Sequence, residues 1–280
     1  MSVKKLLLLW AAALWVMALG TACGLLQDPP APSSTLEAVP LVINTPETAV
    51  ATATTPPTAT AIPTETPAET AMEEPTVPAT AVPEATEEPP TPEPTATEPP
   101  SDPIIFTISQ ADSQVRFELD EDLAGARKTV IGETDQVSGE LAVNFDALSL
   151  TQVGVILINA RTFATDNQFR NRAINNEILD TEEFEFITFT PTAINGLPDS
   201  VAVGAAVEFT IVGELTIRDV TTEVTFAVTA TAVSETQISG TAMATVLRGD
   251  YGLEIPSVPN VANVEDEVDI YIDFVANAAN

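Results

Sequence analysis

The chain contains the run Glu223-Val224-Thr225-Phe226-Ala227-Val228, in which apolar side chains alternate strictly with polar or small ones. Successive side chains of a β-strand point to opposite faces, so Val224, Phe226 and Val228 share one face. The other face carries the polar and small residues. This pattern is typical of a half-buried strand in a closed sheet.

Similar runs of β-branched and aromatic residues, separated by turn residues, occur on both sides of this one. Together the predicted strands are 104–108, 114–119, 136–145, 152–162, 186–194, 207–217, 223–233, 237–247 and 268–276. Eight or nine strands fit one all-β domain, either a barrel or a sandwich. A parallel sheet would need a helix between strands, but the sequence predicts one helix, over 167–179, with Thr165 and Asp166 as candidate caps.

The predicted strand 152–162 differs from the others because both of its faces are apolar. One face carries Val153, Val155 and Leu157, and the other carries Gly154, Ile156, Ile158 and Ala160. We therefore expect this strand to be covered on both sides. A barrel of about eight strands has an interior that is either filled by side chains or able to hold one small ligand. The alternation leaves both possibilities open.

The composition excludes several classes of function. The 280 residues include 41 acidic and 10 basic side chains and no histidine, which gives a formal charge of −31. A nucleic-acid partner is excluded because phosphate binding needs clustered Lys and Arg. Catalysis by an imidazole base and His-ligated metals are excluded as well. The single cysteine removes thiolate metal sites, so we expect no metal centre.

The N-terminus has the pattern of an export signal over residues 1–23. Lys4 and Lys5 precede an apolar run from residue 6 to 19, which ends in Gly20-Thr21-Ala22-Cys23-Gly24. Small residues directly before a cysteine resemble the lipobox of bacterial lipoproteins, in which the cysteine is lipidated. The alternatives are an ordinary secretory signal with a leftover cysteine, or an uncleaved anchor. We expect an exported chain anchored through Cys23 to the outer face of a bacterial cell membrane.

Residues 24–103 consist largely of Pro, Thr, Ala, Glu and Val. Such a segment cannot bury enough apolar area to offset the entropy lost on ordering. Its prolines favour an extended conformation and its negative charge keeps it swollen. We therefore predict a disordered linker between the signal and a β-barrel domain over 104–280, which would act as a spacer that carries the domain away from a membrane.

Three parts of the predicted domain carry a family resemblance. They are residues 162–172 with 177–180 and 184–189, residues 212–221 (VGELTIRDVT), and residues 248–253 (RGDYGL) with Pro256 and 268–272. In this order and spacing they resemble the YceI-like family, exported lipid-binding barrels similar in shape to lipocalins. The chain departs from the family pattern at Glu185, where proline is usual, and at Asp219, where a turn glycine is common. A histidine found in many members near residues 120–122 is also absent.

The resemblance implies an extended antiparallel barrel of about eight strands whose apolar interior holds a long isoprenoid chain, such as a polyprenyl phosphate or a quinone. Removing such a chain from water is favourable by about 25 cal/mol per Å². No catalytic group or other cofactor is then needed. The candidate lining residues are Phe117, Phe145, Val155, Leu157, Phe163, Phe189, Phe209, Phe226 and Phe274. Each could instead be an ordinary core residue.

Five arginines are candidate partners for a phosphate head because guanidinium groups bind phosphate through paired hydrogen bonds. They are Arg161, Arg170, Arg172, Arg218 and Arg248. Acidic residues lie close to most of them in sequence, so local ion pairs compete with this role. Arg170 and Arg172 would pair with Asp166 and Glu177, and Arg218 and Arg248 with Asp219 and Asp250. The negative charge of the chain favours an uncharged head, such as a quinone.

Three hypotheses follow from the sequence. The first is a tethered, non-enzymatic lipid-binding protein, whose oligomeric state the pattern does not fix. The second is a solidly packed barrel that binds another envelope component through its loops. The third is an enzyme that uses carboxylates such as Asp166, Glu177 or Asp250 as acid and base. A continuous apolar cavity would favour the first hypothesis, and a converging pair of buried carboxylates would favour the third.

Overall fold

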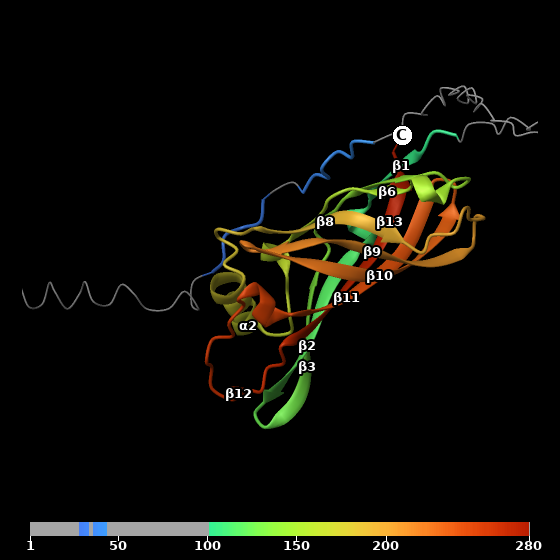
Figure 1. Cartoon of the computed structure of the whole chain (residues 1–280). Coiled ribbons are helices and arrows are strands. Elements are labelled where there is room, and N and C mark those ends of the chain that lie inside the picture. The colour runs from blue at the N-terminus through green and yellow to red at the C-terminus, as the bar shows by residue number, and fades with distance from the viewer. Residues whose placement is uncertain (1–27, 34–35, 44–100, 280) are drawn as a thin grey trace, which may run out of the picture. The chain divides into compact units, whose positions relative to one another are not determined.

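Strands dominate the computed structural model, which describes residues 28–33, 36–43 and 101–279 (Figure 1). The strands are β1 (Ile104–Ile108), β2 (Gln114–Leu123), β3 (Ala126–Thr134), β4 (Val137–Ser138), β5 (Glu140–Val143), β6 (Gln152–Val153), β7 (Ile156–Asn159), β8 (Phe186–Asn195), β9 (Ala206–Ile217), β10 (Val220–Ser234), β11 (Gln237–Leu247), β12 (Val261–Ala262) and β13 (Glu267–Ala278). Helix α2 (Gln168–Ala173) continues into a π-helical turn, Ile174–Ile178. Short 3-10 turns are Gln110–Asp112, Leu148–Leu150, Ala160–Thr162 and Arg248–Tyr251. The predicted signal and Cys23 lie outside the described residues.

All thirteen strands of the described residues belong to one antiparallel sheet that curls until its ends meet. The order of pairing is β4-β7-β8-β9-β10-β11-β13-β1-β5-β6. Only Gly139 separates β4 from β5, while β4 pairs with β7 and β5 pairs with β6. The two ends of the order are therefore joined through the chain itself. This arrangement confirms the predicted all-β antiparallel barrel with one short helix.

The alternation in β10 has the predicted consequence. Val224, Phe226 and Val228 are buried, whereas Thr225 and Ala227 between them are exposed. Neighbouring strands β9 and β11 hydrogen-bond to both edges of β10. The apolar face of this strand thus lines the interior of the barrel.

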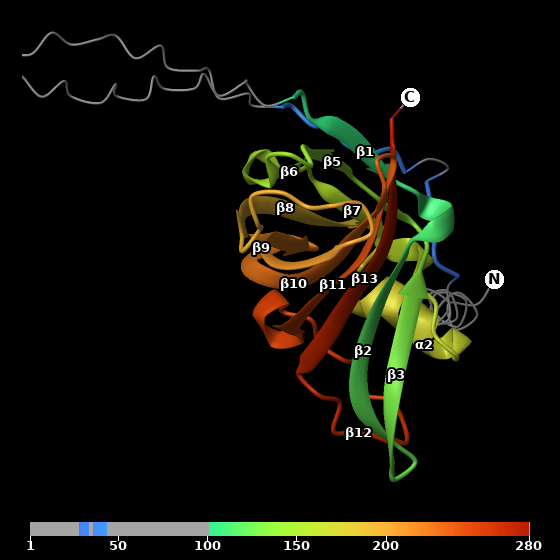
Figure 2. The same ribbon diagram turned by 90° about the vertical axis from the view of Figure 1, so that its right-hand side faces the viewer.

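Strand β3 was not predicted from the sequence. It pairs with β2 in a hairpin that extends past the body of the barrel (Figure 2). Its inward positions are Val130, Gly132 and Thr134, of which only the first is strongly apolar. Because two of the three inward residues are glycine and threonine, the strand lacks the hydrophobic alternation that identifies the others.

The predicted helix is confirmed, but its cap is different from the two candidates. The Asn167 side-chain oxygen accepts hydrogen bonds from the backbone N–H groups of Phe169 and Arg170. Asparagine is one of the best residues at this position because it satisfies N–H groups that have no partner within the helix. The described residues contain no helix with the length and hydropathy needed to cross a membrane.

Close approach between strands explains two glycines of the sheet. A Cβ atom on Gly213 would lie 2.6 Å from the Phe189 ring and 2.6 Å from the carbonyl oxygen of Thr190. A Cβ atom on Gly132 would lie 2.3 Å from the ring of Phe117. Both glycines therefore leave space for a phenylalanine ring to lie against the adjacent strand inside the barrel.

Residues 28–33 and 36–43, here called the N-terminal strap, lie along the outside of the barrel (Figure 1). Ser33 donates from its backbone N–H and its hydroxyl to the Glu185 carboxylate, at 2.6 and 2.7 Å. Further along, the carbonyl oxygen of Leu36 accepts from Gln110 at 2.7 Å, and the Leu41 N–H donates to Glu140 at 2.8 Å. These two stretches were predicted as disordered linker, whereas they belong to the barrel unit.

The strap also explains the unusual strand with two apolar faces. Ile156 and Ile158 are buried inside the barrel. On the outside, the Leu41 side chain lies 3.4 Å from the position that a Cβ atom of Gly154 would take. The outer side is thus covered at Gly154, while Val155 and Leu157 on the other expected face are half-buried.

Glu185 holds the strap as a charged carboxylate. Burial raises its pKa, but the hydrogen bonds from Ser33 and Asn159 and the charge of Arg161 together outweigh burial and hold the pKa below its ordinary value. Arg161 lies 2.8 Å from this carboxylate, and both side chains are largely buried. The strap thus contacts the Arg161–Glu185 ion pair at the barrel wall.

Substitution Gly213→Ala tests the close approach of Phe189. The new methyl group would meet a ring and a backbone carbonyl, of which the carbonyl cannot move without disturbing the sheet. We expect a loss of about 1–3 kcal/mol in the free energy of unfolding, measured by urea denaturation. The control is Glu214→Ala at the adjacent exposed position, for which we expect a change within about 0.5 kcal/mol. Equal stability of the two variants would contradict the packing described here.

Candidate ligand-binding cavity

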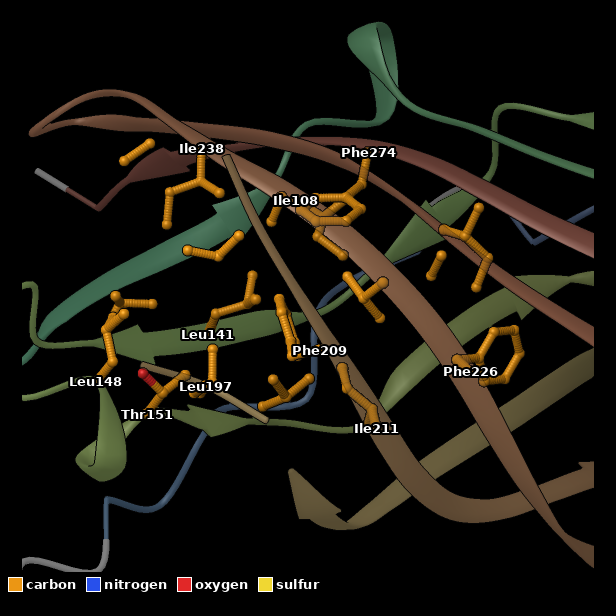
Figure 3. A pocket seen from close by; sticks show the side chains of 18 of the residues that line it. Ile108, Leu141, Leu148, Thr151, Leu197, Phe209, Ile211, Phe226, Ile238 and Phe274 are labelled. Atoms are coloured by element: carbon orange, nitrogen blue, oxygen red, sulfur yellow. The ribbon is translucent and has the colours of Figure 1, made fainter. Parts of the chain in front are cut away.

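Described residues of the barrel line two cavities in its interior, here called the upper and lower compartments. The upper compartment, with a volume of about 110 Å³, lies near the end of the barrel that carries the β8–β9 connection (Figure 3). Thr151 is the one polar residue in its wall. The lower compartment is larger, about 360 Å³, and lies toward the end that carries α2. Its volume falls in the range of about 300–1,000 Å³ that is common for ligand pockets.

An aromatic contact marks the boundary between the compartments. Phe189, Phe226 and Ile272 contribute to the walls of both. The Phe189 and Phe226 rings meet edge to face with centroids 4.9 Å apart. Because the two compartments share these wall residues, the apolar space extends along most of the barrel. This observation favours a hollow barrel over a solidly packed one.

All seven phenylalanines predicted as lining residues line a compartment. They are Phe117 and Phe163 in the lower one, Phe145, Phe209 and Phe274 in the upper one, and Phe189 and Phe226 in both. Phe117 and Phe163 pack edge to face with centroids 5.3 Å apart. Whether any of these rings contacts a ligand stays a prediction, but their placement in the cavity wall agrees with it.

The prediction that Val155 and Leu157 line the cavity is wrong. Ile156 lines the upper compartment and Ile158 the lower one instead. The reason is a break in the strand between β6 and β7, at Gly154 and Val155. An irregular pair of residues shifts the alternation by one position. Val153, before the break, lines the cavity, and after the break Ile156 and Ile158 line it.

Sequence reasoning missed a second wall of the lower compartment. Part of it comes from α2 and its π-helical turn, including Phe169, Ala173 and Ile174. The rest comes from the connection between β11 and β13, which contributes Leu253, Ile255, Pro256, Val258, Pro259, Val261 and Val264. The apolar residues of that connection, interrupted by prolines and without strand alternation, were the available signal. Phe169 lines the compartment and is also 63% exposed, so the compartment reaches the surface beside α2.

A buried ion pair, also missed from the sequence, lies in the wall of the lower compartment. Glu121 is 5% exposed, and Arg170 Nη2 lies 2.6 Å from its carboxylate. Arg170 Nη1 lies 2.6 Å from Asp166, as the sequence predicted. The hydrogen bond from Lys128 and the charges of Lys128 and Arg170 hold the pKa of Asp166 below its ordinary value, although burial opposes them. Arg170 is therefore shared by two carboxylates.

The other candidate arginines also have hydrogen-bond or ion-pair partners within the protein. Arg248 lines the lower compartment and donates to the carbonyl oxygens of Leu253 and Glu265, each at 3.0 Å. Its nearest carboxylate is Asp266 at 3.8 Å, so the predicted pair with Asp250 is wrong.

Three arginines lie away from the lining residues. Arg161 pairs with Glu185. Arg172 pairs with Asp28 at 2.7 Å, and the predicted pair with Glu177 does not form. Arg218 does not pair with Asp219. It donates to the carbonyl oxygen of Ile178 and lies over the ring of Phe184. The structure therefore brings only Arg170 and Arg248, of the five candidates, to the cavity wall.

Tyr251 is a buried polar residue in the wall of the lower compartment, close to the Thr222 hydroxyl. It is 2% exposed, and its hydroxyl has no hydrogen-bond partner among the described residues. Burial raises the pKa of this phenol and the charge of Asp250 adds to the effect, while the Thr222 hydroxyl offsets part of it. The phenol is therefore protonated at neutral pH, and it can donate one hydrogen bond, either to the nearby Thr222 hydroxyl or to a ligand.

The YceI-like domain matches residues 106–276, which is more than half of the chain. The chain belongs to the YceI-like domain family. No curated protein matches the chain.

Three solved structures are similar to this chain to different extents. A polyisoprenoid binding domain from Saccharophagus degradans, implicated in plant cell wall breakdown, is 15% identical with a TM-score of 0.50, covering 63% of this chain and 99% of that one. BcnA from Burkholderia cenocepacia is 20% identical with a TM-score of 0.47, covering 61% and 99%. The YCEI protein of Campylobacter jejuni is 15% identical with a TM-score of 0.44, covering 53% and 85%. The first agrees with the barrel architecture described above.

The carboxylates considered for catalysis lie outside the cavity of this YceI-like domain. Glu177 and Asp250 are exposed, and the Asp166 side chain is 59% exposed. Among the described residues, Glu121 is the one carboxylate that lines either compartment, and it is paired with Arg170. No pair of buried carboxylates converges in the described part of the cavity.

The Glu121–Arg170 pair provides a test of this wall. Arg170→Met leaves a buried carboxylate without its partner, which costs about 3–5 kcal/mol in other proteins. The double variant Glu121→Leu with Arg170→Met removes both charges, so we expect it to be more stable than Arg170→Met alone. Urea denaturation of the unmodified protein, Arg170→Met and the double variant measures the differences in the free energy of unfolding. A double variant less stable than the single one would contradict a buried pair.

Proposed function

We propose that this protein binds an isoprenoid-type lipid inside its barrel and does not act as an enzyme. The observation that carries the proposal is the pair of apolar compartments that meet at Phe189 and Phe226. An apolar chain that passes this contact would lie against aromatic and aliphatic side chains over most of the barrel. Its transfer from water is favourable by about 0.8 kcal/mol for each buried CH₂ group. Membership of the YceI-like family supports the same class of ligand.

The wall of the lower compartment favours an uncharged head group over a phosphate. Arg170 is shared between Glu121 and Asp166, and Arg248 donates to backbone carbonyl groups. A phosphate would have to displace these partners and would face the buried Glu121 carboxylate. A quinone carbonyl needs one hydrogen-bond donor, and the phenol of Tyr251 in the compartment wall can be such a donor. We therefore infer a prenylated quinone or a similar neutral lipid.

Export and anchoring complete the proposal. The pattern of residues 1–23 supports a signal whose Cys23 is lipidated, so that the barrel is held at the outer face of a bacterial membrane. The acidic chain would be repelled by anionic headgroups, and the acyl chains would supply the attachment. The ligand and the anchor then share the same bilayer.

Filling the upper compartment tests the ligand's position. Ala242 lines this compartment and is 9% exposed, so Ala242→Phe places a ring in a space of about 110 Å³. We expect at least about tenfold weaker binding of long-chain prenylated quinones, equivalent to about 1.4 kcal/mol, with little change for short-chain homologues. Native mass spectrometry with a chain-length series measures both affinities.

The control for this experiment is Met243→Phe, at the next residue of the same strand. Met243 is 37% exposed on the outer surface, so its ring would leave the cavity unchanged. If Ala242→Phe and Met243→Phe bind every chain length equally well, the ligand does not occupy the upper compartment.

A further inference from the structure

The N-terminal strap provides a contact with the barrel close to the proposed anchor. Its first described residue, Asp28, pairs with Arg172 on α2 at 2.7 Å. The strap then continues through Ser33 at Glu185 to Leu41 at Glu140. The chain therefore contacts the barrel before the Pro-rich segment, at the end that carries α2.

The connection between the proposed anchor and this contact is short. Four residues separate Cys23 from Asp28. A fully extended chain gains at most about 3.6 Å for each residue, so the five steps span no more than about 18 Å. The Pro-rich residues 44–99 follow the strap and precede β1, so their length adds nothing to this distance. The predicted spacer does not lie between the membrane anchor and the barrel.

The same end of the barrel carries the opening of the lower compartment. Phe169 on α2 is 63% exposed and lines that compartment. The opposite end carries the β8–β9 connection, with Val203 exposed at 52%. Strand β10 has fifteen residues, and at about 3.3 Å per residue it separates the two ends by up to about 50 Å. A tether of about 18 Å that ends at α2 cannot bring the opposite end to a bilayer while the barrel axis is perpendicular to the bilayer.

We propose that the lipidated protein stands on the bilayer with α2 against it, so that Phe169 enters the headgroup region and the lower compartment opens directly toward the lipid. This inference rests on the proposed function and adds the route of the ligand. A hydrophobic chain would pass between bilayer and barrel without crossing water. The partner is the lipid surface itself, recognised by an exposed aromatic side chain beside an apolar opening.

Fluorescence quenching tests this orientation. Both tryptophans of the chain, Trp10 and Trp15, lie in the predicted signal, so a chain that begins at Cys23 contains none. Phe169→Trp and Val203→Trp therefore each introduce a single fluorophore at opposite ends of the barrel. The lipidated chain, isolated from membranes and checked for acylation by intact mass, is placed in phosphatidylcholine vesicles with and without brominated lipid. Because interfacial side chains enter the headgroup region by several ångströms, we expect F169W to be quenched at least about twofold more than V203W.

A spacer variant separates the tether from any affinity of Phe169 itself. Insertion of about twenty Gly and Ser residues between Cys23 and Asp28 extends the tether by a root-mean-square length of about 25 Å. We expect the quenching of F169W to fall toward that of V203W. Equal quenching of the two tryptophans in the unmodified chain, an F169W signal unaffected by the spacer, or an unacylated chain would each overturn the proposal.

Lipid extraction from the same samples distinguishes this proposal from the proposed function. Quenching of F169W in a protein that contains no isoprenoid lipid would support the orientation and refute the ligand. An isoprenoid lipid in a protein whose F169W is not quenched would support the ligand and refute the orientation.

Discussion

The edge-to-face contact between Phe189 and Phe226 is the constraint on which the cavity depends. It lies between two strands of a closed sheet, where Gly213 leaves the space that the Phe189 ring occupies. The two rings narrow the barrel without filling it, so apolar space remains on both sides. A protein interior is normally packed to the density of an organic crystal, so an apolar space of this size is unusual.

Most of the fold could be predicted from the sequence because strand alternation is a local property. The run in β10 indicates which of its faces is buried, whereas the seven phenylalanines predicted as lining residues were expected from the resemblance to the YceI-like family. Val155 and Leu157 could not be placed correctly, because the irregularity at Gly154 changes which side chains point inward without leaving a compositional signal. Strand β3 was missed because Gly132 and Thr134 occupy inward positions that are usually apolar.

The polar part of the site was less predictable, since its pairs join residues far apart in the chain. Glu121 meets Arg170 and Glu185 meets Ser33 only after the barrel has closed. Local pairing identified the contact between Arg170 and Asp166 but gave the wrong partners for Arg172, Arg218 and Arg248. The strap illustrates the same limit, because composition alone assigned residues 28–33 and 36–43 to a disordered linker. Long-range contacts in the barrel hold those residues in place.

The central claim is that the apolar interior holds one isoprenoid lipid. Native mass spectrometry of the chain from residue 24 to 280, purified without detergent from a host that makes isoprenoid lipids, tests it most directly. The account predicts one bound molecule per protein, whose fragments contain repeating isoprene units and an uncharged head. A protein that carries no lipid, and stays empty after incubation with prenylated quinones and polyprenyl phosphates, would contradict it.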